Sequence, residues 1–430
     1  MKPILITGGR VIDPSQNIDE IADIFLADGQ VQTPPPHRED ANMEIIDAKG
    51  LVVCPGFIDL HCHLRQPGQE HKETIASGTR AAAHGGFTTV CCMPNTDPPL
   101  DNAAIISYVK HIATTEGVVR VLPIGTITRG RQGTELADLS ELTRAGAVAF
   151  SDDGSYVSSA HVMRQALEYA RQLGLPVIEH CEEPALFAGG QMNEGLIATR
   201  LGLPGIPSAA EEVAAARDII LSELTGARLH LAHVSTAGTV ELVRQAKKNG
   251  LAVTAEVTPH HLTLTEERVL GYNTKAKVNP PLRTADDISA LITGLQDGTI
   301  DAIATDHAPH AEKDKLSEFA TAAWGISGLE TALGSLMSLV HCGKLELRIL
   351  IGLLTAGPAR ILGVHGLGLG TLALGSRADL VIFDPEEEWI VDTATFASRG
   401  RNTPLDGATL KGKVRTTIYN GEVIYRNGGD

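Results

Sequence analysis

The middle of the chain, from residue 56 to residue 305, alternates short apolar runs with amphipathic segments. Three of the latter, 160–173, 209–224 and 240–249, have helical periodicity. We expect the apolar runs to be the strands 56–62, 86–93, 118–126, 146–151, 175–180, 228–233, 251–257 and 300–305. Strands that alternate with helices predict a parallel sheet with helical crossovers. Eight such units predict an α/β fold of the (β/α)8 TIM-barrel type, with its active site at the carboxyl ends of the strands.

The two ends of the chain have a different pattern, in which short alternating apolar runs are separated by turn signals. Asn420-Gly421, between two such runs, predicts a two-residue hairpin turn. We expect residues 1–54 and 365–430 to form one small composite β-sandwich domain. Residues 55–364 would then form the barrel.

Composition excludes several classes of protein. The formal charge is −16 and no Lys/Arg cluster occurs, which argues against nucleic-acid binding. The sequence shows neither a signal peptide nor an apolar stretch suited to a membrane span, so we expect a soluble, cytoplasmic protein. Six cysteines without a C-x-x-C spacing indicate small buried residues in a reducing compartment.

The first strand, within Gly56–Arg65, ends in two histidines and an arginine. Because side chains alternate along a strand, His61, His63 and Arg65 share one face. Neutral imidazole is a common zinc ligand, so this spacing places two nitrogen ligands side by side. Taken alone, the pattern also fits buried or solvent-facing histidines.

Most of the other strands also end in polar side chains of the types that bind metals. These ends are Met93–Thr96, Ser151–Gly154, Glu179–Cys181, His230–Ser235, Thr258–His261 and Ala304–His310. The third strand offers only Thr126 and Thr128. Polar residues at nearly every exit of otherwise apolar strands suit a site better than a core, and they predict a metal centre.

Five strings together resemble the amidohydrolase superfamily and, within it, the class I bacterial dihydroorotases. They are Gly56–Arg65, Met93–Thr96, Phe150–Gly154, Lys277–Arg283 and Ala304–His310. The resemblance implies reversible hydrolysis of dihydroorotate to N-carbamoyl-L-aspartate in de novo pyrimidine (UMP) biosynthesis. It also implies one or two zinc ions per chain, with two favoured.

Residue by residue, the resemblance implies zinc ligation by His61, His63, Asp153, His180, His233 and Asp306. It implies substrate binding by Arg65, Asn95, Asn279 and His310. In this chemistry a zinc-held hydroxide attacks the ring carbonyl, with Asp306 as the general base and then the acid. The Arg65 guanidinium matches the substrate carboxylate.

Several neighbouring residues compete for these roles. Asp152 and Asp153 could both be a turn pair before Gly154, and we favour Asp153 as the ligand. His230 and His233 point to opposite faces of a strand, so we favour His233 and treat His230 as a packed neighbour. We expect three further histidines to be structural or supporting residues: His260, His261, and His307, the last facing outward or bracing its loop.

Two rival functions remain open. Hydantoinases and allantoinases usually bridge two metals with a carboxylated lysine after the fourth strand, but no lysine occurs between Lys110 and Lys247. A non-catalytic scaffold of an aspartate carbamoyltransferase assembly would have lost metal ligands, and this chain keeps all six. We expect a small-molecule substrate and a homo-oligomer, and a carbamoyltransferase complex is compatible with activity. The charged loop 311–318 is a candidate lid.

Overall fold

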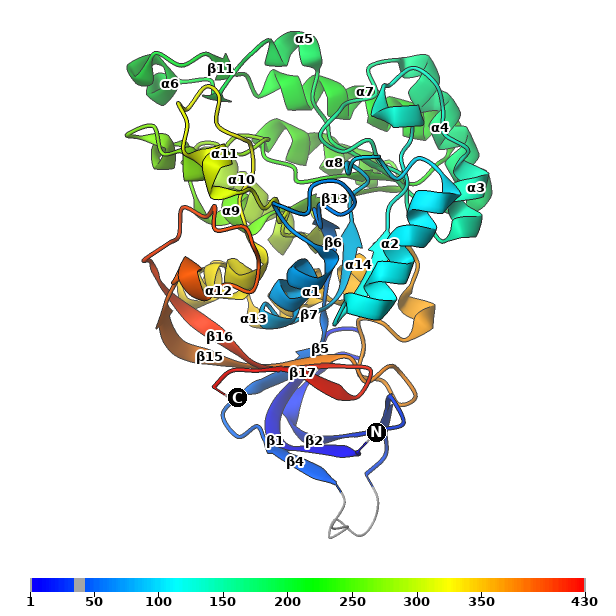
Figure 1. Cartoon of the computed structure of the whole chain (residues 1–430), viewed down its shortest axis with the longest axis vertical. Helices are drawn as coiled ribbons and strands as arrows, with labels where there is room; N and C mark the ends of the chain where they lie inside the picture. The colour runs from blue at the N-terminus through cyan, green and yellow to red at the C-terminus, as the bar shows by residue number, and fades with distance from the viewer. Residues whose placement is uncertain (1, 35–42, 429–430) are drawn as a thin grey trace.

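A computed structural model describes residues 2–34 and 43–428 (Figure 1). Its middle part contains two parallel sheets built from short, buried, aliphatic strands. The first has the order β6-β7-β8, with bounds Phe57–Cys62, Phe87–Cys92 and Arg120–Pro123. The second has the order β14-β13-β12-β9, with bounds Ala302–Ile303, Val253–Val257, Leu229–Leu231 and Val177–Glu179.

Isolated bridges join these two sheets on both sides. Phe150 pairs in parallel with Gly125 after β8 and with Val177 of β9, and Cys62 of β6 pairs with His307 after β14. The predicted strand 146–151 is therefore reduced to pairing at Phe150. Its backbone still hydrogen-bonds to both neighbours, since the Val148 N–H donates to the Pro123 carbonyl and the Ile178 N–H to the Phe150 carbonyl.

Helices follow most of the strands, and local capping explains where they begin and end. The longer ones are α1 (Ile75–His84), α2 (Ala103–Glu116), α4 (Ala160–Leu173), α7 (Ala209–Thr225), α8 (Ala237–Lys248), α10 (Ala285–Gln296), α12 (Ala332–His341) and α13 (Leu347–Leu354). The shorter ones are α3 (Leu139–Ala145), α5 (Pro184–Phe187), α6 (Leu196–Leu201), α9 (Pro259–Thr263), α11 (Glu312–Lys315) and α14 (Ala356–Leu362). Helix α8 begins three residues before the predicted start because the Thr236 hydroxyl caps the Thr239 N–H.

The two ends of the chain share one eight-stranded sheet, which lies below the helical body in Figure 1. Its strands are β1 (Ile4–Asp13), β2 (Ile18–Ala27), β3 (Gln30–Gln32), β4 (Glu44–Asp47), β5 (Val52–Pro55), β15 (Leu380–Ile390), β16 (Thr409–Tyr419) and β17 (Glu422–Arg426). The ends meet where β5 pairs antiparallel with β15. The predicted turn at Asn420-Gly421 is confirmed, with φ of 52° and 81° between β16 and β17.

Residues 391–408, between β15 and β16, leave the sheet and reach the loops that follow β14. The Asn402 side chain donates to the Ala308 carbonyl, and the Glu330 carboxylate accepts from the Ala397 N–H. The segment therefore connects the end of the chain to the carboxyl-terminal edge of the middle strands.

Two of the expectations from composition can be compared with the described part of the chain. None of its helices is long and apolar enough to cross a bilayer. Five of the six cysteines are buried, but Cys342 is exposed, because it lies just after the end of α12.

Candidate metal centre

His61 and His63 project from the end of β6 into one buried space, as the strand alternation predicts. Their ring centroids lie 5.4 Å apart. His61 Nε2 lies 3.3 Å from Asp153 Oδ1 and 3.6 Å from Asp306 Oδ1. His63 Nε2 lies 3.0 Å from the same Asp306 oxygen. The loops that follow Phe150 and β14 therefore supply carboxylates to the two imidazoles.

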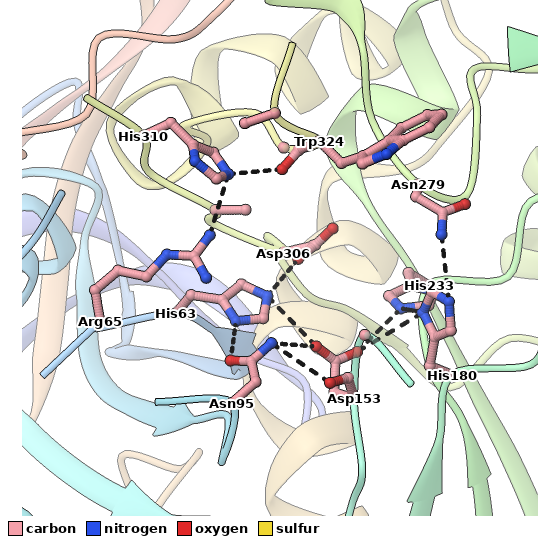
Figure 2. Close-up of a pocket in the computed structure, with 14 residues that line it drawn as sticks. His63, Arg65, Asn95, Asp153, His180, His233, Asn279, Asp306, His310 and Trp324 are labelled. Carbon is pink, nitrogen blue, oxygen red and sulfur yellow. Dashed lines mark hydrogen bonds and ion pairs between the residues drawn. The ribbon is translucent and has the colours of Figure 1, made fainter. Parts of the chain in front are cut away.

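His180 and His233, which follow β9 and β12, complete the cluster (Figure 2). His233 Nε2 lies 3.5 Å from Asp153 Oδ1 and 3.0 Å from His180 Nδ1. The structure thus brings together all six residues that the sequence suggested as ligands. Among them, His61, Asp153 and His233 form one group whose ligand atoms lie within 4.8 Å of one another, and His61, His63 and Asp306 form a second.

The donor set fits a divalent cation. All six side chains are buried, and His61 Nε2 has no hydrogen-bond partner in the described structure although two carboxylates flank it. A buried polar atom without a partner is costly, and a cation would satisfy it. Imidazole nitrogens and carboxylate oxygens are the ligands that zinc takes in hydrolase sites.

The pKa values of Asp306 and His61 show how the charges of the cluster are balanced when no metal is bound. Burial raises the pKa of Asp306, but the hydrogen bond from His63 and the charge of His61 leave it well below its ordinary value. Burial lowers the pKa of His61, yet the charge of Asp153 and their hydrogen bond raise it well above its ordinary value. Without a metal, a proton on His61 therefore balances part of the carboxylate charge.

The structure separates the roles of Asp152 and Asp153. The Asp152 carboxylate accepts the N–H groups of Ile127 at 2.8 Å and Thr128 at 3.1 Å, and it also accepts the Thr128 hydroxyl. It therefore holds the turn after β8. Only Asp153 faces the imidazoles.

Glu256, which the sequence reasoning did not single out, supports the cluster from β13. Its fully buried carboxylate lies 3.2 Å from His61 Nδ1 and 3.1 Å from His230 Nε2. Because His61 Nδ1 donates to it, His61 Nε2 is left as the ligand nitrogen. The position of Glu256 inside the mostly apolar run Val253–Val257 is the sequence feature that could have indicated a functional role.

Asn95 touches two of the candidate ligands. Its amide oxygen accepts from His63 Nδ1 at 2.9 Å, and its amide nitrogen donates to Asp153 Oδ2 at 3.2 Å. The first bond turns His63 Nε2 toward Asp306, in the same way that Glu256 orients His61.

A cavity of about 360 Å³ opens beside the cluster and contains the predicted substrate residues (Figure 2). Arg65 is 8% exposed and donates from Nε to the Pro309 carbonyl at 3.2 Å. Burial lowers its pKa to about 10, so it stays charged at neutral pH. On the opposite wall Asn279 donates to Glu182 at 2.7 Å. Among the described residues that line the cavity, Arg65 is the only lysine or arginine, and it lies close to the candidate metal ligands.

His310 and Trp324 form the wall next to Arg65. His310 Nε2 donates to the Trp324 carbonyl at 2.7 Å and lies 3.4 Å from Arg65 Nη2. Burial and the charge of Arg65 lower the pKa of His310 to about 2, so the ring is neutral. Trp324 was missed because nothing in its sequence neighbourhood marks it as lining a site.

Three other histidines of the strand ends, His230, His261 and His307, make their side-chain bonds outside the six candidate ligands. The His230 ring pairs with Glu256 and Thr254 outside the cluster. His261 donates from Nε2 to the Pro280 carbonyl at 2.9 Å. His307 braces its loop against Glu73 at 3.3 Å, but it is 1% exposed and does not face outward, because the C-terminal segment covers it through Ser398.

Hydrogen bonds from the buried side chain of Lys315 hold the loop 311–318 in place. It contains α11, and the ammonium of Lys315 is buried and donates to the carbonyls of Thr274, Lys277 and Ala323. These bonds hold the loop against the segment that carries Trp324.

The chain is similar to known proteins over most of its length. A family model described as Dihydro-orotase-like matches residues 50–239. A dihydroorotase of Pelotomaculum thermopropionicum is 53% identical over 99% of both chains. A dihydroorotase of Syntrophotalea carbinolica is 52% identical over 98% of this chain and 99% of the relative. Among solved structures, the L-hydantoinase (dihydropyrimidinase) of Arthrobacter aurescens is similar with a TM-score of 0.88, at 27% identity over 100% of this chain and 97% of that one.

These likenesses extend over nearly the whole chain, and they place the protein among hydrolases that act on cyclic amides. At about half identity over that length, the chain belongs to the dihydroorotase family.

Proposed function

We propose that this protein is a zinc-dependent dihydroorotase that interconverts dihydroorotate and N-carbamoyl-L-aspartate in pyrimidine biosynthesis. The observation that carries the proposal is the presence, in one cavity, of a cluster of metal-binding side chains and the buried guanidinium of Arg65. The cluster suits hydrolysis of an amide, and the guanidinium suits a substrate that carries a carboxylate.

Six candidate ligands exceed the four that one zinc ion usually takes, so the set would hold two zinc ions, and His61 Nε2 would bind one of them because an imidazole nitrogen has a single lone pair. The Asp153 carboxylate lies between the groups, with one oxygen toward His61 and the other 3.6 Å from His63 Nε2. A bound zinc ion supplies Lewis acidity, which makes water a stronger acid and an amide carbonyl more electrophilic.

Asp306 is the residue we assign to proton transfer. It lines the cavity, and although burial raises its pKa, the hydrogen bond with His63 and the charge of His61 lower that pKa below its ordinary value, so its carboxylate is ionised. In ring opening, water adds to the ring carbonyl and its proton passes to Asp306. The ring C–N bond then breaks, and Asp306 returns the proton to the leaving nitrogen. Ring closure uses the same steps in reverse.

Arg65 would bind the substrate carboxylate through its planar fork of N–H donors. Asn95, Asn279 and His310 lie around the same cavity and would contact the rest of the ring. Both asparagines present amides, which can pair with the ring's own amide and imide groups.

The overall architecture supports the same assignment. We infer that the two parallel sheets and their bridges form a closed (β/α)8 barrel over residues 55–364, with a composite β-sandwich domain from residues 1–54 and 365–430. A cytoplasmic homo-oligomer fits a metabolic enzyme of this family, and so does association with an aspartate carbamoyltransferase.

The likeness to an L-hydantoinase favours a second candidate, the opening of neutral cyclic amides. Both candidates are tested by one experiment, in which the zinc content of the purified chain is measured together with turnover of dihydroorotate and dihydrouracil. We expect zinc-dependent turnover of dihydroorotate and poor turnover of dihydrouracil. Equal turnover of the two rings would support the second candidate and contradict the first.

A further inference from the structure

We propose that Asn402, which lies between the last two long strands of the chain, is a positioning residue of the active site. It holds the two loops that form the substrate side of the cavity. The proposal adds a residue outside the barrel to the site, and its link to the substrate carboxylate rests on the proposed function.

The two loops are residues 305–310 and 323–327, which supply Asp306, Ala308, His310, Trp324 and Gly325 to the cavity wall. The contact between their backbones is limited: the Ala308 N–H donates to the Ile326 carbonyl, and His307 pairs with Ile326. Away from Ile326, the position of one loop relative to the other therefore depends on side chains that bond to both.

The Asn402 side chain supplies those groups and uses its full bonding capacity. Its amide nitrogen donates to the carbonyls of Ala308 at 2.9 Å and Gly325 at 3.0 Å. Its amide oxygen accepts the His310 N–H and the Ser327 hydroxyl, each at 2.9 Å. An amide has two N–H donors and one oxygen with two lone pairs, so only Asn or Gln offers this combination.

Because Asn402 is buried, the loss of any of these hydrogen bonds would leave a polar group without a partner. Asn402 is 3% exposed, so water does not replace a bond that is lost there. The segment also approaches the loops too closely for any side chain at position 400. A Cβ on Gly400 would lie 2.4 Å from Pro309 Cβ and 2.5 Å from Ser327 Oγ.

The loops in turn hold the guanidinium that we assign to the substrate. Arg65 donates from Nε to the carbonyl of Pro309, which lies between the two residues that Asn402 fastens. His310 reaches Trp324 across the same gap. Asn402 therefore acts on Arg65 and His310 through the backbone, without itself lining the cavity.

The test uses Trp324 as a reporter that does not depend on turnover. The chain has two tryptophans, so Trp389→Phe leaves Trp324 as the single tryptophan, which can be excited at wavelengths where the six tyrosines absorb little. In this background Asn402→Ala removes all four side-chain bonds. Asn402→Asp keeps the acceptor oxygen but replaces the two N–H donors by an anionic oxygen that faces the Ala308 and Gly325 carbonyls, so it is the more disruptive variant. The control is Thr393→Val, which removes a hydroxyl bonded to Asp406 in the same segment, away from the two loops.

We expect both Asn402 variants to shift the Trp324 emission and to raise KM for dihydroorotate at least 10-fold, with zinc content unchanged and kcat changed much less. Thr393→Val should leave emission and KM within twofold. Unchanged emission and KM in both Asn402 variants would overturn the proposal, and so would a loss of zinc that parallels the rise in KM. If the parent protein fails to turn over dihydroorotate while the emission still shifts, the proposed function fails and the positioning role stands.

Discussion

The most direct test of the metal centre changes Glu256, which is not one of the six candidate ligands but bonds to one of them, His61. Glu256→Gln keeps the shape of a fully buried side chain but removes its charge. The amide oxygen can still accept from His61 Nδ1. The amide nitrogen would then face His230 Nε2, and His230 can accept it by donating from Nδ1 to Thr254, 2.8 Å away. The fold should therefore survive.

The expected loss follows from the change in one hydrogen bond. A bond to a charged acceptor contributes about 1.5–3 kcal/mol and a neutral one about 0.5–1.5 kcal/mol, so His61 should lose about 1–2 kcal/mol of support. This corresponds to zinc binding that is weaker by about 5-fold to 30-fold, near the range typical of residues that orient metal ligands. Glu256→Leu leaves His61 Nδ1 without an acceptor and should weaken binding further.

Zinc affinity should be measured by competition with a chelator of known affinity at fixed pH. The matched control is Asp13→Asn, which removes the charge of an equally buried carboxylate in the terminal sheet, where it accepts the N–H groups of Ser15 and Leu372. Native affinity in Glu256→Gln would refute the reasoning. So would an equal loss in Asp13→Asn, because the effect would then follow from stability alone.

Three further outcomes are expected. His61→Ala should abolish tightly bound zinc and turnover while circular dichroism shows an intact fold, because both ligand groups share His61; retained zinc would contradict the assignment. Arg65→Met should lower kcat/KM for dihydroorotate by about 2–4 kcal/mol with zinc content unchanged, and loss of zinc would contradict the carboxylate role. In metal-free protein the raised pKa of His61 increases the free energy of unfolding; this gain is complete below about pH 6.5 and is lost as the pH rises. The lowered pKa of Asp153 also increases the free energy of unfolding; this gain is present above about pH 3.8 and is lost as the pH falls. The unfolding temperature after chelation should therefore be highest between about pH 4 and 6.5, and a flat profile from pH 5 to 9 would contradict this.

The sequence was most informative where a signal is local. Strand alternation placed His61 and His63 on one face, and the structure has their rings facing the same space. Helix α4 spans Ala160–Leu173 as predicted, because a serine caps its start and Gly174 ends it with φ of 71°. Each of these features depends on residues that are neighbours in the chain.

The features that could not be predicted depend on residues far apart in the chain. The fourth strand shrinks to pairing at Phe150, which bridges to Gly125 on one side and Val177 on the other. The tautomer of His61 depends on Glu256, and the cavity wall on Asn402. Neither residue belongs to a motif with local spacing, so only the assembled structure shows their partners.

These two residues support different halves of the site. Glu256 orients the candidate metal ligand His61 from within the strands, whereas Asn402 bonds to the loops 305–310 and 323–327 from a segment that leaves the terminal sheet. Residues without shared partners usually act additively. Loss of zinc affinity in Glu256→Gln and the rise in KM in Asn402→Asp should therefore combine without coupling in the double variant. A double variant whose KM effect disappears once zinc is saturated would show instead that the loops are placed by the metal centre.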